Sequence, residues 1–159
     1  MARRLTHVDS SGRVHMVHVG DKKVTRRTAV ARGRVFMHRD TLARLERADT
    51  PKGDVLAAAH LAGVMAAKKT SELIPLAHPL PLDSVELGFA LDRDNSSVAI
   101  EARVSTRART GVEMEALTAV AMAALTLYDM LKAVDRGMVI GEVALWEKRG
   151  GKSGVWRRR

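Results

Sequence analysis

Four charged residues stand in a stretch of chain that is otherwise mostly apolar and small. Residues 110–134 predict one long helix, yet Glu113, Glu115, Asp129 and Lys132 fall within it. Acids on a core-like helix are costly to desolvate unless they are paired or used. At about 100° per residue, Glu115 and Asp129 share one stripe of the helix, and Lys132 lies at its edge. This helix is therefore the first place to expect chemistry.

The spacing of Asp129 and Lys132 places a proton donor beside an acceptor. Residues three apart on a helix meet on one face, and a nearby ammonium group keeps an aspartate ionised. An ordinary surface ion pair has the same spacing, so the pair alone leaves both interpretations open. Glu113 has a structural explanation of its own, because Thr110 and Glu113 have the spacing of a capping box. Glu115 has no such explanation.

Outside this helix the candidates are a histidine, several lysines and a glycine-rich segment. His78 stands in a proline-rich loop, where it is either an acid–base group or the partner of a backbone carbonyl. Lys52 and the lysine pair at 68–69 either bind phosphate or solvate helix ends. Residues 150–154 resemble half a phosphate loop, but the first glycine and the following helix of a Walker loop are missing. A glycine-rich basic segment can still wrap a phosphate.

The composition bounds the class of protein. The chain has 159 residues, enough for one domain with a hydrophobic core. It has no cysteine, which excludes a disulfide scaffold and thiolate chemistry and favours a cytoplasmic protein. We expect no membrane-spanning segment and no signal peptide. His15 and His18 have metal-like spacing, but no cysteine or nearby acid completes a tetrahedral set, so we expect no metal and no cofactor.

The net charge of +9 favours an anionic partner. Nucleic acid, anionic lipid and a polyphosphate metabolite all fit this excess, and so does a solvated basic surface. Single-strand binding usually stacks bases on aromatic side chains, and the chain has two Trp, two Phe and one Tyr. A basic nucleic-acid-binding module stays open as an alternative, although the shortage of aromatics argues against it.

The apolar pattern predicts an α+β fold. Residues 1–33 are expected to form a basic, partly flexible arm, residues 34–148 the folded domain, and residues 149–159 a basic, glycine-containing tail. The elements are expected at 34–38, 40–45, 55–73, 84–92, 97–106, 110–134 and 139–146, with Asp54 as an N-cap. Their order is strand, helices, strand, strand, helix and strand. This order predicts a ferredoxin-like α/β plait, a four-stranded, mainly antiparallel sheet with helices on one face.

Five segments match a family pattern in the same order along the chain. They read KGDV at 52–55, LIPLxHPL at 73–80, TGVEMEALTA at 110–119, LTLYDMxKA at 125–133 and KxGGKSG at 148–154. With them the chain resembles the MoaC family, the cyclic pyranopterin monophosphate synthases of molybdenum cofactor biosynthesis. The resemblance covers nearly the whole chain, including Leu5-Thr6-His7 and His15-Met16-Val17.

The resemblance implies a lyase and assigns roles to its residues. It implies a small plait subunit in a homohexamer, a trimer of dimers with active sites at the dimer interface. It implies a cyclised dihydro-GTP substrate from a partner radical SAM enzyme, with cyclic pyranopterin monophosphate and pyrophosphate as products. By motif position Asp129 matches the catalytic acid–base residue, and Lys132 matches the essential lysine. The matching substrate-binding positions are Leu76, Ala77, His78, Met114, Glu115, Glu113, Lys52, Lys148, Lys152, Lys22 and Arg27.

The chemistry of such a reaction fits these residue types. A triphosphate substrate explains basic residues gathered around a few acids. Departing pyrophosphate needs cationic stabilisation of developing negative charge. Rearrangement of a pterin precursor needs proton shuttles rather than a metal or a thiol nucleophile. Neither nucleic acid nor a membrane is expected as a partner.

The chain departs from the family pattern at three positions. The family usually has Asp at His18, Ser at Gly20 and Cys at Ala77. Ala77 indicates that the thiol is not chemical, because a backbone contact there survives the substitution. His18 replaces an acid of the arm and raises another alternative, a catalytically weakened relative that keeps assembly but not rate.

The length of the predicted helix separates two of its acids. Glu115 and Asp129 lie about 21 Å apart along a continuous helix at about 1.5 Å per residue. Both cannot touch the reacting centre of one small substrate from the same chain. We therefore expect a pocket shared across a two-fold interface, with the small residues of 119–124 permitting close packing.

Overall fold

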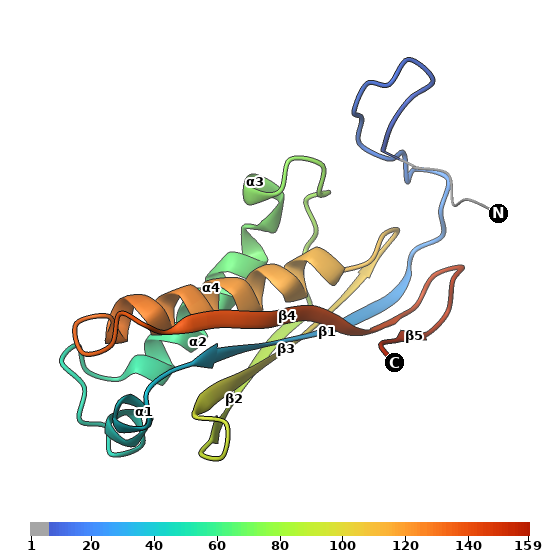
Figure 1. Cartoon of the computed structure of the whole chain (residues 1–159). Coiled ribbons are helices and arrows are strands. Elements are labelled where there is room, and N and C mark those ends of the chain that lie inside the picture. The colour runs from blue at the N-terminus through green and yellow to red at the C-terminus, as the bar shows by residue number, and fades with distance from the viewer. Residues whose placement is uncertain (1–6) are drawn as a thin grey trace.

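The computed structural model describes residues 7–159, and its helices α2 and α4 cover one face of an antiparallel sheet (Figure 1). Leu5 and Thr6 of the family resemblance lie outside the described residues. The order of the elements is the predicted one, with α3 and β5 added. The elements are β1 (Thr25–Phe36), α1 (Arg39–Glu46), α2 (Val55–Lys68), α3 (Thr70–Leu73), β2 (Ser84–Asp92), β3 (Ser97–Ala108), α4 (Glu113–Leu131), β4 (Val139–Arg149) and β5 (Trp156–Arg157).

The sheet has the strand order β2-β3-β1-β4-β5, and all of its pairings are antiparallel. The first four strands form the predicted ferredoxin-like plait. The predicted count of four strands is wrong by one, because the chain after the glycine-rich segment turns back and pairs Trp156 and Arg157 with β4.

Strand β1 begins at Thr25, nine positions before the start predicted at residue 34. Its core-facing positions are filled by small residues, among them the buried Ala29 and Ala31, while arginines such as Arg26 and Arg32 point outward. Small apolar residues alternating with arginines resemble a polar arm in composition. The pairing of β1 with both β3 and β4 makes this segment the centre of the sheet.

Helices α2 and α4 pack closely against each other and against the sheet because small residues stand at their contacts. A Cβ atom added to Gly63 of α2 would lie 3.0 Å from the backbone oxygen of Ala119 in α4 and 2.6 Å from a Leu87 methyl group of β2. Asp54 caps α2 as predicted, since its carboxylate accepts a 2.9 Å hydrogen bond from the Ala57 N–H.

The start of α4 differs from the prediction. The helix begins at Glu113 with Val112 as its N-cap, and no side chain caps it, so the capping box of Thr110 and Glu113 is wrong. The Glu113 carboxylate instead folds over Gly111, where an added Cβ would lie 1.9 Å from its Oε2. The helix ends at Leu131, which leaves Lys132 as the C-cap.

By length and composition alone, α4 is apolar enough to cross a membrane, contrary to the prediction that no segment is. A buried core helix passes the same test. In this structure Ala116, Val120 and Leu127 of α4 are fully buried in the core beneath α2 and against the sheet. The apolar character of α4 is therefore explained by its place in the core.

Candidate functional site

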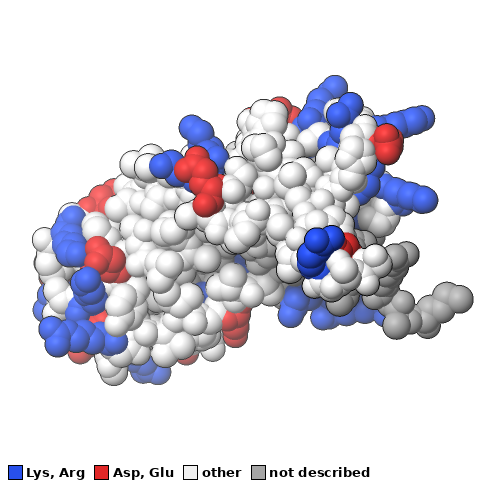
Figure 2. Space-filling model, turned by 90° about the horizontal axis from the view of Figure 1, so that it is seen from above, with Lys and Arg blue, Asp and Glu red and all other residues white. Residues whose placement is uncertain are grey.

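The ionisable side chains singled out in the sequence form two clusters at opposite ends of α4. One cluster surrounds Asp129 at the C-terminal end of the helix, and the other surrounds Glu115 at its N-terminal end. Seen from the helix side, charged side chains gather toward the two ends of the molecule, while the middle of this face is largely uncharged (Figure 2).

Asp129 is held between two lysines. Lys132 Nζ lies 2.8 Å from Asp129 Oδ1, and Lys52 Nζ lies 3.0 Å from Asp129 Oδ2 and 2.9 Å from the Asp129 backbone oxygen. The hydrogen bonds and charges of Lys132 and Lys52 lower the pKa of Asp129, and Asp129 in turn raises the pKa of Lys132. All three side chains remain about half exposed, so the cluster faces solvent in the isolated chain.

The contact between Asp129 and Lys132 confirms the helical spacing argument. Lys52 comes from the turn before α2, and its direct contact with Asp129 could not be predicted, because the two residues are 77 positions apart. The main chain brings the end of α4 beside this turn. An aspartate between two ammonium groups stays ionised, so it can accept a proton in transfer, and the neighbouring lysines are the proton donors and fixed positive charges beside it.

The other cluster lines a cavity of about 380 Å³ at the start of α4. It brings together seven of the predicted binding residues from the arm, the proline-rich loop and the helix. Those seven are Lys22, Leu76, Ala77, His78, Glu113, Met114 and Glu115. His7, Val17, Val19, Leu80, Thr110 and Gly111 complete the lining without having been predicted as site residues, although most stand inside or beside the matched motifs.

Glu115 is the most perturbed acid of this cavity. It is 4% exposed, and its burial raises the pKa of its carboxyl from 4.5 to about 7, with a smaller contribution from the charge of Glu113. A carboxyl group with a pKa near neutrality can both donate and accept a proton at physiological pH. Glu115 therefore has the properties of an acid–base group, and its burial is the main cause of its raised pKa.

His78 fixes the arm against the proline-rich loop. Its Nε2 lies 2.9 Å from the backbone oxygen of Val17, and because a carbonyl only accepts, Nε2 carries the proton and donates. The structural interpretation of His78 as the partner of a backbone carbonyl is thus confirmed, and its other ring nitrogen stays available at the cavity wall. The bond holds Val17 and the nearby Lys22 over the cavity.

The glycine-rich segment packs on Arg27. Gly150 and Gly151 have φ angles of 103° and 72°, and a Cβ atom on Gly151 would lie 1.9 Å from Arg27 Nη1. Arg27 also donates hydrogen bonds of 3.3 Å and 3.1 Å to the backbone oxygens of Ala108 and Arg109. The guanidinium group is therefore locked between this segment and the end of β3.

The remaining predicted lysines, Lys148 near the end of β4 and Lys152 in the glycine-rich segment, do not line the cavity. Lys148 donates a hydrogen bond to Ser153 Oγ, and Lys152 is exposed. The chain after Gly154 continues into β5 rather than a helix, which agrees with the exclusion of a Walker loop.

Two of the three departures from the family pattern are coupled in space. A Cβ atom at Gly20 would lie 2.8 Å from Cε1 and Nε2 of His18, so the imidazole occupies the space that a larger residue would need. His18 Nε2 also lies 3.6 Å from Asp21 Oδ2. Within residues 7–159 no group of three His, Cys, Asp or Glu side chains could hold a metal, so the pair His15 and His18 forms no such site there.

Comparison with known proteins gives one consistent result. The model of the MoaC family matches residues 16–151. Proteins named cyclic pyranopterin monophosphate synthase are similar over almost their full length. The one from Thermomicrobium roseum is 59% identical over 97% of this chain and 93% of its own length. Those from Heliobacterium modesticaldum and Pelotomaculum thermopropionicum are 60% and 58% identical, over 97% and 98% of this chain and 97% and 91% of their own lengths.

Proposed function

This chain belongs to the MoaC family, and from that membership and the two clusters on α4 we propose the reaction that it performs. It is a lyase of molybdenum cofactor biosynthesis that forms cyclic pyranopterin monophosphate. Its substrate is the cyclised dihydro-GTP, (8S)-3',8-cyclo-7,8-dihydroguanosine 5'-triphosphate, supplied by a radical SAM enzyme, and pyrophosphate is released. The observation that carries the proposal is the near-neutral pKa of Glu115 in a cavity that collects seven matched motif residues.

Proton transfer is divided between the two clusters. Asp129 and Lys132 are proposed as the catalytic pair, with Lys52 holding the second carboxylate oxygen and so fixing the orientation of the carboxylate. At the other cluster His78 and the backbone around Ala77 and Met114 bind the substrate, and Glu115 both binds it and exchanges a proton with it. Proton shuttles of this kind are what rearrangement of a pterin precursor requires.

Cationic side chains beside the cavity would stabilise the departing pyrophosphate. Lys22 lines the cavity, and Arg27 lies locked beside the glycine-rich segment that carries Lys148 and Lys152. Negative charge grows on the leaving group as the bond to it breaks, and fixed cations stabilise that charge. This role accounts for the locked conformation of Arg27.

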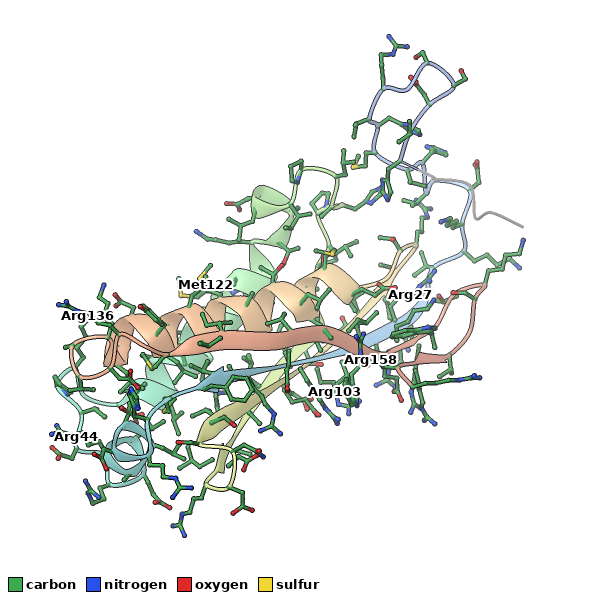
Figure 3. All side chains as sticks on the ribbon, viewed as in Figure 1. Arg27, Arg44, Arg103, Met122, Arg136 and Arg158 are labelled. Carbon is green, nitrogen blue, oxygen red and sulfur yellow. The ribbon has the colours of Figure 1, made fainter. Side chains whose placement is uncertain are left out.

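The two clusters form one site when two chains meet. Along α4, Glu115 and Asp129 lie about 21 Å apart at about 1.5 Å per residue, too far for one chain to offer both to a reacting centre. Between the clusters the outer face of the helix layer is apolar and exposed. Leu125 of α4 is 52% exposed, Leu61 and Met65 of the neighbouring α2 are 61% and 51% exposed, and Met122 of α4 points away from the sheet (Figure 3). A two-fold axis through the middle of this face places the Asp129 cluster of one chain at the Glu115 cavity of its partner.

We extend this arrangement to the assembly and its location. Three such dimers form the homohexamer that is expected for the family, and the enzyme works in the cytoplasm without a nucleic-acid or membrane partner. The apolar helix face supports the dimer, because exposed apolar patches of this kind mark protein–protein contacts.

Two assays test the proposal. Incubation with the cyclised nucleotide, followed by conversion of the product to a stable pterin derivative, should show turnover; no product would refute the reaction. For the shared pocket, the inactive variants Glu115→Gln and Asp129→Asn are mixed after partial denaturation and reassembled. Mixed dimers should regain activity, because one of the two pockets carries neither lesion. Mixed assembly proven by mass spectrometry without any recovery would mean that each chain builds its own site.

A further inference from the structure

The face of the sheet opposite the helices carries a basic hollow that the proposed reaction does not use. This hollow has a volume of about 440 Å³ and lies across the middle strands. Figure 3 shows Arg103 on the side of the sheet away from α2 and α4. The residues that line it are Arg26, Thr28, Ser84, Glu86, Arg103, Ser105 and Arg149.

The strand register builds the floor of the hollow from hydroxyl groups. Ser84 pairs with Ser105, Ser105 pairs with Thr28, and Thr28 pairs with Arg149, so these four residues form one row across β2, β3, β1 and β4. The hydroxyl oxygens of Ser84 and Ser105 lie 2.7 Å apart. Each hydroxyl has one proton, and one of the two serines donates its proton to the other. The second serine and Thr28 can therefore donate to an anion placed above the row.

Guanidinium groups stand on both sides of this row. Arg103 precedes Ser105 by two positions on β3, and Arg26 precedes Thr28 by two positions on β1. Because β1 and β3 are antiparallel, the two arginines lie on opposite sides of the row, each about 7 Å from it along its strand. An arginine side chain is long enough to reach back over that distance, so both can close on the same anion.

The positive charge of the hollow is only partly neutralised by the chain itself. Within residues 7–159 neither Arg26 nor Arg103 has a carboxylate oxygen within ion-pair distance, whereas Arg149 lies 2.5 Å from Glu147. Glu86, which pairs with Arg103 across β2 and β3, is the single carboxylate that lines the hollow. Like charges gathered on one sheet face destabilise it unless a counter-ion binds between them.

We propose that this hollow binds a small phosphate-bearing anion, of the size of pyrophosphate. The guanidinium fork matches phosphate oxygens in pairs, and the hydroxyl row supplies further donors. No aromatic side chain stands among the lining residues, so the hollow offers no surface for a nucleobase and recognises the phosphate groups alone. It is a second anion site on the opposite face of the sheet from the cavity at Glu115, and it does not depend on the proposed reaction.

Pyrophosphate is the probe, and its binding is measured by calorimetry. The parent protein carries Lys22→Ala, Lys148→Ala and Lys152→Ala, which remove the lysines proposed to stabilise the departing pyrophosphate without changing a residue that lines the hollow. Adding Arg26→Gln and Arg103→Gln should weaken the pyrophosphate binding that this parent retains by about tenfold or more. Each substitution removes an arginine that donates charge-assisted hydrogen bonds to the anion. The matched control is Arg44→Gln on α1, an exposed arginine remote from the hollow, which should leave binding unchanged.

Two results would overturn the proposal. Either the Arg26→Gln, Arg103→Gln protein binds pyrophosphate as its parent does, or sedimentation shows that these substitutions change the oligomeric state, which would make the hollow a contact between copies of the chain. A GTP titration separates the two possible sources of the phosphate: equal loss of GTP and pyrophosphate binding supports recognition of the phosphate groups alone. Because no turnover is measured, failure of the proposed reaction leaves this test intact.

Discussion

Glu115 should make the stability of the protein depend on pH in a defined window. Its pKa rises from 4.5 to about 7 in the folded chain, because burial disfavours the charged form. A carboxyl group with a raised folded pKa contributes stability that is fully present below the unfolded pKa and is lost as pH rises through the folded pKa. The shift corresponds to about 3 kcal/mol, lost mainly between pH 5 and pH 7.

The variant Glu115→Gln keeps the shape of the side chain and removes its titration. Near pH 4 both proteins should have similar free energies of unfolding, and at pH 8 the variant should be more stable by up to about 3 kcal/mol. Denaturant unfolding from pH 4 to pH 8.5 measures the difference, and Glu72→Gln on the exposed surface of α3 is the control. The same variant should lose turnover, because an amide cannot shuttle a proton.

Two outcomes of this experiment are informative. Parallel stability curves for the wild type and Glu115→Gln across the whole range would refute the assignment of a raised pKa to Glu115. The pH range in which stability is lost could instead lie lower in the assembled protein and return to about pH 5–7 on dissociation. Because a nearby cation lowers the pKa of a carboxyl, this result would place a cation of the partner chain beside Glu115, as the shared pocket requires.

The remaining predictions concern the other site residues. Asp129→Asn and Lys132→Ala should each abolish turnover with the fold intact by circular dichroism, because each breaks the 2.8 Å pair; near-normal product formation would remove the residue from the mechanism. Loss of Lys52, Lys148 or Lys152 should weaken GTP binding, which should also fall with salt, and an oligonucleotide that competes better than GTP would favour nucleic-acid binding. Gly20→Ser should change KM more with His18 present than in His18→Asp, and additive effects would show that the two positions are independent.

The strongly periodic parts of the fold could be predicted from the sequence. The hairpin of β2 and β3 alternates apolar and polar residues, and α4 carries a long apolar stripe, so both were predicted near their observed positions. The sequence pattern predicts only the last part of strand β1, because arginines such as Arg26 and Arg32 alternate with the buried Ala29 and Ala31, and composition does not distinguish this segment from a basic arm. The capping box failed because Glu113 folds over Gly111 instead of reaching back to Thr110.

The site was predictable where its contacts are local and not where they cross the chain. Asp129 and Lys132 are neighbours on one helix, so their spacing predicts their contact. The bonds from Lys52 to Asp129 and from His78 to Val17 join residues 77 and 61 positions apart, and these depend on how α2, α4 and the arm are placed by the sheet. For Lys52 and His78 the residue types alone left a functional and a structural interpretation open, and the resemblance to the family favoured the functional one.

The length of α4 connects the fold to the proposed mechanism. A helix running from Glu113 to Leu131 holds its ends apart as a rigid rod, so the acids near those ends cannot converge within one chain. The outer face of the same helix is apolar midway between these acids. In the proposed dimer, a two-fold contact at this face brings the N-terminal end of one α4 to the C-terminal end of the other α4, so that two equivalent sites form. A shorter helix would allow a complete site within one chain. In the proposed shared pocket, assembly is a condition for catalysis, and the half-exposed Asp129 cluster would acquire the desolvated surroundings in which a lysine and a carboxylate transfer protons effectively.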